Sequence, residues 1–219
     1  MNITISQQLK EIYPGVQLAT LIVRNAINKN YDERLEREKR ALEGFIRVNY
    51  QEPDKLKRVQ EYSNFYRKFE GIFPIEYQLR SILAGNQIPA VSCLVEVMFM
   101  NELKYCCLAA GHDLEAIQGD LILDLAEGSE SYIKINDQEQ TIKKGDIILK
   151  DQVGIIASVL YGPDSRTKII PISRNIIYMS YFLFKIERAE IISIMVDLTR
   201  LLKITEGPHA QIEKMNIYS

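Results

Sequence analysis

The amino-acid sequence predicts an α+β fold, a single domain in which helices pack on a mostly antiparallel sheet. Apolar residues in the first half recur at helical spacing. From Leu121 onward they form short runs separated by turn residues, a pattern typical of strands. Helices that precede a series of strands favour the α+β class. A chain of 219 residues with 47% hydrophobic content is also long enough to bury one substantial core.

The first half is predicted to hold one strand and four helices. The strand, Val16 to Val23, is rich in β-branched residues and follows a Pro-Gly turn signal. Apolar and charge periodicity predict helices over residues 31–45, 56–69, 75–83 and 94–110. Pro53 separates the first two helices, Gly85 closes the third, and Gly111 is a suitable C-cap for the fourth.

The second half is predicted to form the sheet and one further helix. Five runs have the composition of strands, with Gly, Asn-Asp, Gly-Asp or Gly-Pro between them: LILDLA, SYIKI, DIILK, GIIASVLY and NIIYMSYFLF. An amphipathic helix is expected over residues 188–203. The domain is therefore expected to span residues 1–205, with 206–219 as a polar C-terminal tail.

Charge and hydropathy exclude several classes of protein. The net charge of −2 is too small for a polycation that grips long duplex DNA. Between Arg24 and Lys68, twelve basic residues stand against eight acidic ones, which suits either a phosphate-binding face or a solvated helix surface. With no run of about 20 apolar residues and no signal-peptide pattern, the sequence predicts a cytosolic protein without membrane contact. The three cysteines are expected to be reduced core thiols.

Motifs for cofactors and metals are absent from the sequence. It has no Gly-rich phosphate loop, no dinucleotide fingerprint, and no Cys-x-x-Cys or His-Glu-x-x-His pattern. Its only histidines are His112 and His209, too few for a histidine-rich zinc site. We therefore expect no cofactor and no metal.

Four segments, taken in order, resemble one protein family. Phe65 to Val91 holds an aromatic-basic stretch, a short helix ending in Gly, and a Pro, and the segment CLVEVMFMNEL follows it. Ala110 to Glu130 adds an Asp-Leu step and a Gly-Asp strand entry, and Lys143 to Asn175 adds paired strands with an Arg-Thr loop. The order and spacing of these segments resemble the tRNA-binding and editing domain, called B-three/B-four, of the bacterial phenylalanyl-tRNA synthetase beta subunit.

This resemblance covers about half of the chain and implies a free-standing tRNA-associated domain. Nothing in the sequence resembles a class II ATP-binding core, so aminoacylation is not expected. The family favours a small-polar, Asn-containing stretch after Leu-Val-Asp, where this chain has Phe99 and Met100. Because those polar positions help to shape the synthetase's pocket, the amino acid recognised there does not transfer to this protein.

The predicted helix over residues 94–110 supplies the first candidate site residue, Glu96. On a helical projection Glu96 shares a face with Met100, Leu103 and Cys107, opposite Asn101. Its carboxylate is suited either to the positive N-terminal end of the helix or to a pocket that holds a substrate's ammonium group. Phe99 and Gly111 are candidates for the same substrate-binding region.

His112 and Asp113 follow the expected C-cap and are predicted to lie on a loop. As a candidate catalytic pair they would position or deprotonate water, with His112 as the base. The alternatives are a structural or exposed histidine and an aspartate that caps the short turn over residues 114–117, which is the role we prefer for Asp113.

The loop from Tyr161 to Thr167 completes the candidate site. Tyr161, Gly162, Arg166 and Thr167 offer a stacking surface, a tight turn, a cation and a hydroxyl, which would suit the 3′ end of a tRNA. An ordinary Gly-Pro hairpin is the alternative.

Two functional hypotheses follow from the sequence. In the first, the protein hydrolyses mischarged aminoacyl-tRNA in trans, with Glu96 on the ammonium group and His112 on the water. In the second, it is a non-catalytic module that binds an RNA end or an amino acid. An interaction domain with a vestigial pocket would need neither ligand.

Overall fold

The computed structural model describes residues 1–206, 210–213 and 215–219. Its helices are α1 (Gln7–Ile12), α2 (Glu33–Asn49), α3 (Lys57–Arg67), α4 (Pro74–Leu83), α5 (Cys93–Tyr105) and α6 (Arg188–Glu206), with a short 3₁₀ turn at Pro53–Lys55. Its strands are β1 (Ile3–Ile5), β2 (Gln17–Arg24), β3 (Leu108–Asp113), β4 (Leu121–Leu125), β5 (Ser131–Ile133), β6 (Glu139–Thr141), β7 (Ile147–Lys150), β8 (Ile155–Ser158), β9 (Gly162–Pro163), β10 (Ile176–Phe182), β11 (Gln211–Ile212) and β12 (Asn216–Tyr218).

The strands form two larger sheets and one hairpin. The central sheet has the antiparallel order β11-β2-β10-β3, and β12 also pairs with β2. The second sheet has the order β1-β4-β7-β8-β9, in which only the β1–β4 pair is parallel. Strands β5 and β6 form a separate hairpin. The predicted α+β class with a mostly antiparallel sheet is thus confirmed.

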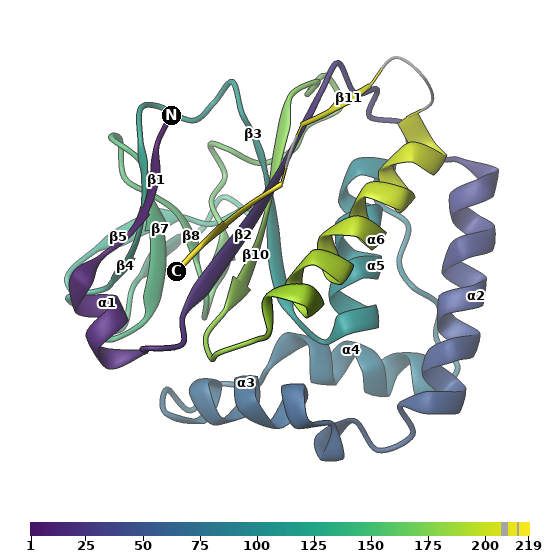
Figure 1. Ribbon diagram of the computed structural model, residues 1–219, viewed down its shortest axis with the longest axis horizontal. Coiled ribbons are helices and arrows are strands. Elements are labelled where there is room, and N and C mark those ends of the chain that lie inside the picture. Colours follow the sequence, from purple (N-terminus) through teal and green to yellow (C-terminus); the bar gives the residue numbers. More distant parts are fainter. Residues whose placement is uncertain (207–209, 214) are drawn as a thin grey trace.

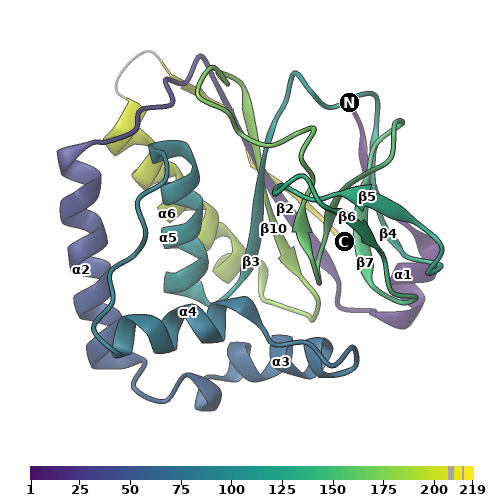
Figure 2. The same ribbon diagram turned by 180° about the vertical axis from the view of Figure 1, so that it is seen from behind.

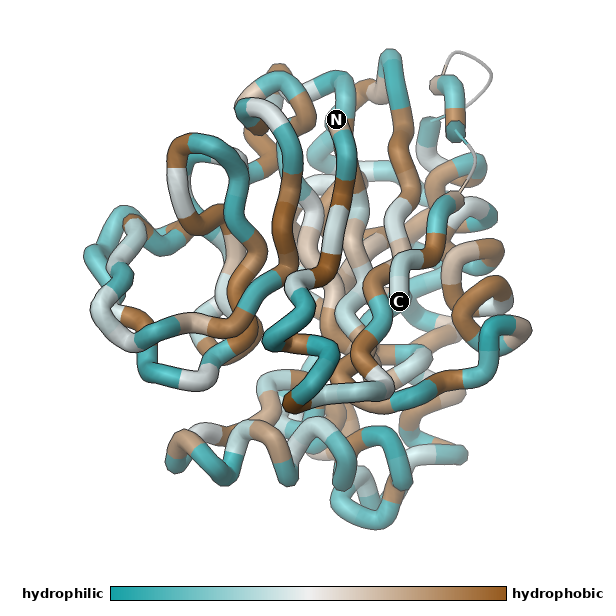
Figure 3. The backbone as a smooth tube through the Cα atoms, turned by 60° about the vertical axis from the view of Figure 1, so that its left-hand side comes forward, coloured by the Kyte–Doolittle hydropathy of each residue, from teal (hydrophilic) through white to brown (hydrophobic). Residues whose placement is uncertain are grey.

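Helices and sheets are arranged in layers around the central sheet (Figure 1). Helices α5 and α6 cover one of its faces, α2 lies outside them, and the second sheet lies on its other side. Helices α3 and α4 run across one end of these layers. Hydrophobic stretches follow the strands and hydrophilic stretches gather in peripheral turns (Figure 3). None of the described helices combines the length and apolarity needed to cross a membrane.

Most elements lie where the apolar pattern predicts them. Strand β10 is buried along its whole length between its two neighbours, as its mostly apolar sequence indicates. The aromatic side chains of α3, Tyr62, Phe65 and Tyr66, are buried in the core. The Tyr62 ring stacks on Phe73 with centroids 4.8 Å apart. All three cysteines are buried and unpaired.

The predicted end of the fourth helix is wrong. Helix α5 ends at Tyr105 because Cys106 adopts a left-handed conformation, with φ of 50°, and caps the helix. Residues 108–113 then form β3 instead of helix and loop. Gly111 is therefore a strand residue paired with Tyr178 of β10, and His112 and Asp113 belong to the same strand.

Both ends of the described chain join sheets. At the start, β1 pairs with β4, an element that the short apolar pattern did not predict. At the other end, the predicted polar tail 206–219 needs correction, because its described residues include β11 and β12, which add to β2. The edge of β2 offers backbone donors and acceptors that these residues satisfy. His209, assigned to that tail, lies outside the described residues.

Candidate functional site

A cavity of about 350 Å³ lies among α4, α5, β3 and the β8–β9 segment. Figure 2 shows α4, α5 and β3 from the side on which the β5–β6 hairpin lies in front. The hairpin contributes Ile135 to the cavity and is fixed to β9, because the Tyr132 hydroxyl donates to the carbonyl of Gly162 at 2.8 Å. Apolar side chains dominate the lining, which suits a small organic ligand.

Among the described residues that line the cavity, Glu102 is the only Asp, Glu, Lys, Arg or His. It belongs to α5, is 7% exposed, and its Oε1 accepts a 2.7 Å hydrogen bond from the N–H of Ala109. Burial raises the pKa of Glu102 to about 8, although the hydrogen bond from Ala109 acts in the opposite direction. No lysine, arginine or histidine appears among the described lining residues.

The sequence pattern of α5 explains why Glu102 was missed. The cavity face of the helix consists of Val95, Met98, Phe99 and Glu102, at the i, i+3, i+4 and i+7 positions of one helical face. This helix is buried on nearly every side, so no single apolar stripe distinguishes the cavity face from the core face. A search for a carboxylate at helical spacing from Phe99 would have found Glu102.

Four of the predicted site residues do line the cavity. Phe99 contributes from α5, Gly111 from β3, and Tyr161 and Gly162 from the segment between β8 and β9. Gly162 has φ of 86°, which favours glycine at this turn. Met100, by contrast, is buried in the hydrophobic core and does not line the cavity.

Glu96 lies outside the cavity and faces α2. Its Oε2 is 2.9 Å from Nζ of Lys39, and its Oε1 accepts a 2.8 Å hydrogen bond from the N–H of Val91. Burial lowers the pKa of Lys39, but the bonds to Glu36 and Glu96 outweigh it, so the pKa stays above its ordinary value. The face of α5 that carries Glu96 packs in the core, and Asn101, expected opposite it, is also buried, donating to the carbonyl of Ile194 at 3.0 Å.

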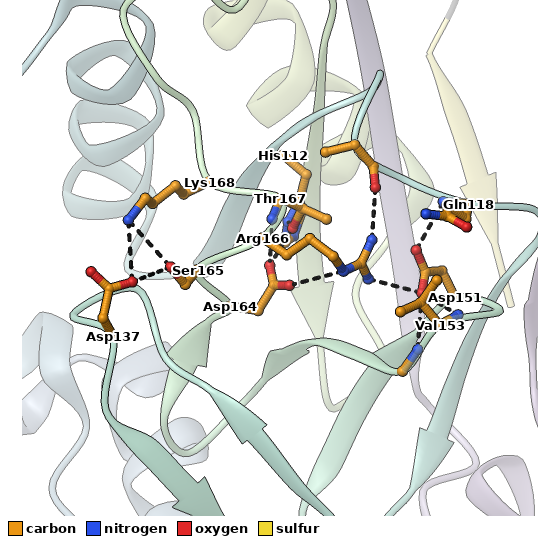
Figure 4. A network of polar contacts seen from close by, with 12 residues as sticks. His112, Gln118, Asp137, Asp151, Val153, Asp164, Ser165, Arg166, Thr167 and Lys168 are labelled. Carbon is orange, nitrogen blue, oxygen red and sulfur yellow. Dashed lines mark hydrogen bonds and ion pairs between the residues drawn. The ribbon is translucent and has the colours of Figure 1, made fainter.

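His112, Thr167 and Arg166 belong to a polar network beside the cavity, shown in Figure 4. His112 is fully buried, with Nδ1 2.7 Å from Oγ1 of Thr167, whose hydroxyl donates to Asp164. Among the described residues, Nε2 of His112 has no hydrogen-bond partner. Burial and the nearby charge of Arg166 lower the pKa of His112 to about 4, so the ring is neutral. The ring does not line the cavity, which separates it from a ligand bound there.

Arg166 ties three segments together. Its guanidinium donates to the carbonyl of Ala116 at 2.7 Å and to Oδ1 of Asp151 at 2.9 Å, and its Nε lies 3.8 Å from Asp164 (Figure 4). Asp151 also accepts the N–H groups of Gln118, Val153 and Gly154. These contacts fix the loops at the end of the second sheet, and neither Arg166 nor Thr167 lines the cavity.

Asp113 has the capping geometry that its position predicts. Its Oδ1 accepts a 3.0 Å hydrogen bond from the N–H of Glu115, and the hydroxyl of Ser173 donates to Oδ2 at 2.5 Å. Asp113 therefore closes the turn after β3 and does not line the cavity. In the part of the chain that the structure describes, no group of three or more His, Cys, Asp or Glu side chains is arranged to hold a metal ion.

The fold and cavity define an α+β domain that encloses a ligand-sized, mainly apolar pocket with one buried carboxyl group. A comparison with family models gives the finer assignment. The chain belongs to the B3/4 domain family, whose model matches residues 63–199. That range includes α4, α5, the hairpin and every strand that lines the pocket.

Two known proteins of similar sequence are subunits of a tRNA ligase. The chain is 34% identical over 107 residues to the phenylalanine–tRNA ligase beta subunit of Mycoplasma genitalium, a match that covers 47% of the chain and 13% of the relative. The same subunit of Mycoplasma pneumoniae is 26% identical over 104 residues, covering 45% and 12%. The chain thus matches only a small part of each relative's length.

A solved structure agrees in fold. An N-terminal fragment of the phenylalanyl-tRNA synthetase beta subunit from Pyrococcus horikoshii superposes with a TM-score of 0.54 at 11% sequence identity. The match covers 96% of this chain and 50% of that fragment. At this identity the likeness concerns the fold alone.

Proposed function

We propose that this chain is a tRNA-associated domain whose cavity binds the aminoacyl group at the 3′ end of a charged tRNA. Membership of the B3/4 family and the tRNA ligase subunits among its relatives support the association with tRNA. The observation that carries the proposal is the set of ionisable groups in the cavity, which has a buried carboxyl group at Glu102 and no basic side chain among its described lining residues.

This charge arrangement favours an aminoacyl ester over a free amino acid. Both ligands have an α-ammonium group that can donate hydrogen bonds to the carboxylate of Glu102. A cation beside a buried carboxylate stabilises the ionised form of that carboxylate. A free amino acid also brings a carboxylate, for which the cavity offers no counter-charge, and burying an unpaired charge is costly. Esterification to tRNA removes that carboxylate, so the ester is the better ligand.

The mainly apolar lining adds a place for the side chain of the bound amino acid. Glu102 stands at the end of the α5 face that also carries Val95, Met98 and Phe99. An ammonium group on Glu102 therefore leaves the apolar part of the ligand against these residues. We assign the ribose and base of the tRNA end to the partly buried Tyr161 and the exposed Ile135, which also line the cavity.

Hydrolysis of mischarged aminoacyl-tRNA in trans is the second candidate function. In this candidate Glu102 acts on the water instead of pairing with the ammonium group, and its pKa, raised to about 8, is near neutrality, where a general base or acid is most effective. An aminoacyl ester is already activated, so one positioned water and one base are sufficient chemistry. The sequence predicted that His112 positions the water, but His112 does not line the cavity. This proposal therefore assigns the positioning of the water to Glu102.

The proposal is tested by measuring the affinity of the purified chain for tRNAs in charged and uncharged form. We expect charged tRNA to bind at least tenfold more tightly, since a hydrogen-bonded charge pair contributes roughly 1.5 to 3 kcal/mol. Glu102→Gln should remove this preference, whereas Gln substitution of the exposed Glu127 should not. Equal binding of both forms by the wild type would refute the ligand assignment.

The same samples separate binding from catalysis. Release of the amino acid from a panel of correctly and incorrectly charged tRNAs is followed over time. Selective deacylation of mischarged tRNA that is lost in Glu102→Gln supports the second candidate. Tight binding of charged tRNA without deacylation leaves a non-catalytic binding module.

A further inference from the structure

We infer that Gly111, together with Ile169, sets the size of the amino-acid side chain that the cavity admits. The inference rests on the proposed function, because it concerns the ligand of the same cavity. Gly111 lies in β3, opposite Tyr178 of β10, and lines the cavity together with Ile169.

The reason for glycine at this position is space rather than backbone conformation. Gly111 is not among the glycines with positive φ, so its strand conformation is open to other residues. A Cβ atom built on Gly111 would stand 2.8 Å from Cδ1 of Ile169 and 3.3 Å from Cε1 of Tyr178. A carbon pair in favourable contact is about 3.5 to 4.0 Å apart, so a methyl group at this position forces a neighbour to move.

Ile169 is the neighbour that yields. Tyr178 is fully buried, and its hydroxyl is fixed by a 2.8 Å hydrogen bond to the carbonyl of Leu94. Ile169 is only partly buried, and the atom that the methyl group would meet is the far end of its flexible side chain. Because Ile169 borders the cavity, the cavity is the open space into which it moves.

A methyl group on residue 111 therefore reduces the room for a bound side chain. The smaller cavity weakens the binding of a ligand whose large apolar side chain reaches the wall between β3 and Ile169. It leaves the binding of a ligand with a shorter side chain unchanged. Ammonium recognition by Glu102 is separate, because the atoms nearest to a Cβ on Gly111 belong to Ile169 and Tyr178 and not to Glu102. Gly111 thus determines size selectivity without contributing to charge recognition.

The test uses amino-acid amides, which carry the ammonium group and lack the free carboxylate. Affinities of alaninamide, valinamide, leucinamide and phenylalaninamide are measured by calorimetry for four proteins: wild type, Gly111→Ala, Ile169→Val, and the double variant. Ile169→Val removes Cδ1, the atom that the added methyl would meet. The matched control is Gly44→Ala, because a Cβ on Gly44 meets nothing within 4 Å.

We expect Gly111→Ala to weaken the binding of the largest amides about tenfold and the binding of alaninamide less than twofold. This agrees with the discrimination that one methylene gives in an apolar pocket. The double variant should recover most of the loss, and Gly44→Ala should match the wild type. Melting temperatures check that each variant is folded.

Three outcomes oppose the inference. If Gly111→Ala weakens all four amides equally, or none of them, the position does not select by size. If Ile169→Val fails to rescue a folded Gly111→Ala, the contact with Cδ1 is not the cause. If the wild type binds no amide at all, the ammonium-binding cavity of the proposed function fails as well, which separates the two failures.

Discussion

Replacing Glu102 by Gln should change how the stability of the protein depends on pH. Burial raises the pKa of this carboxyl from 4.5 to about 8, so the folded state holds a proton that the unfolded state releases. The stability contributed by that proton is complete below about pH 4.5 and is lost as the pH rises through about 8. At ~1.4 kcal/mol per pKa unit, the loss between about pH 5 and pH 8 is roughly 3 to 4 kcal/mol as an upper limit.

Glutamine keeps the shape of the side chain and an acceptor for the N–H of Ala109, but it does not titrate. Urea unfolding of wild type and Glu102→Gln at a series of pH values measures the difference in unfolding free energy. We expect the unfolding free energy of the variant, relative to that of the wild type, to increase steadily as the pH rises. Glu127→Gln, at an exposed position, should show no such trend. A free-energy difference that stays constant from pH 5 to pH 8 would refute the burial argument for Glu102.

Three further predictions concern groups outside the cavity. Lys39→Met should lower the unfolding free energy by roughly 3 to 5 kcal/mol because it leaves Glu96 buried without its cation, and adding Glu96→Leu should recover most of the loss in urea unfolding. The imidazole of His112 should show no titration by NMR from about pH 8 to pH 5, because burial lowers its pKa to about 4; its contribution to stability is lost as the pH falls below 6.5 toward that value. Arg166→Lys should cost roughly 1 to 3 kcal/mol and speed hydrogen exchange around Ala116, since lysine cannot reproduce the guanidinium contacts to Ala116 and Asp151; unchanged exchange would contradict this.

The fold class and most elements were predictable because they follow from apolar periodicity. The boundary of α5 was not, because its capping residue is Cys106, a residue type that seldom adopts positive φ. Gly111 was mistaken for that cap. The role that we infer for it depends on the distance to Ile169, a residue 58 positions away in the sequence and brought close only by the fold.

The candidate site was predictable in part for a similar reason. Phe99, Gly111, Tyr161 and Gly162 line the cavity, because the segments that carry them meet in the fold. The helical projection brought Glu96 into the candidate site and did not indicate Glu102, because a helix buried on nearly all sides gives no signal for which face borders a cavity. The aromatic and glycine residues of a segment indicate that it can hold a ligand. The direction in which one carboxylate points depends on the helices packed around it, and the sequence pattern does not give their positions.

The parallel pairing of β1 with β4 has a consequence for the order of folding. Ile3 stands opposite Leu121, so the first strand of the chain has no partner until well over a hundred residues have been synthesised. Strand β2 remains unpaired for longer still, because its partner β10 begins at Ile176. During synthesis, which proceeds from the N-terminus, these apolar strands stay unpaired while the helices between them form locally. Slow translation or a stall before Ile176 should therefore expose β2 to aggregation or to a chaperone.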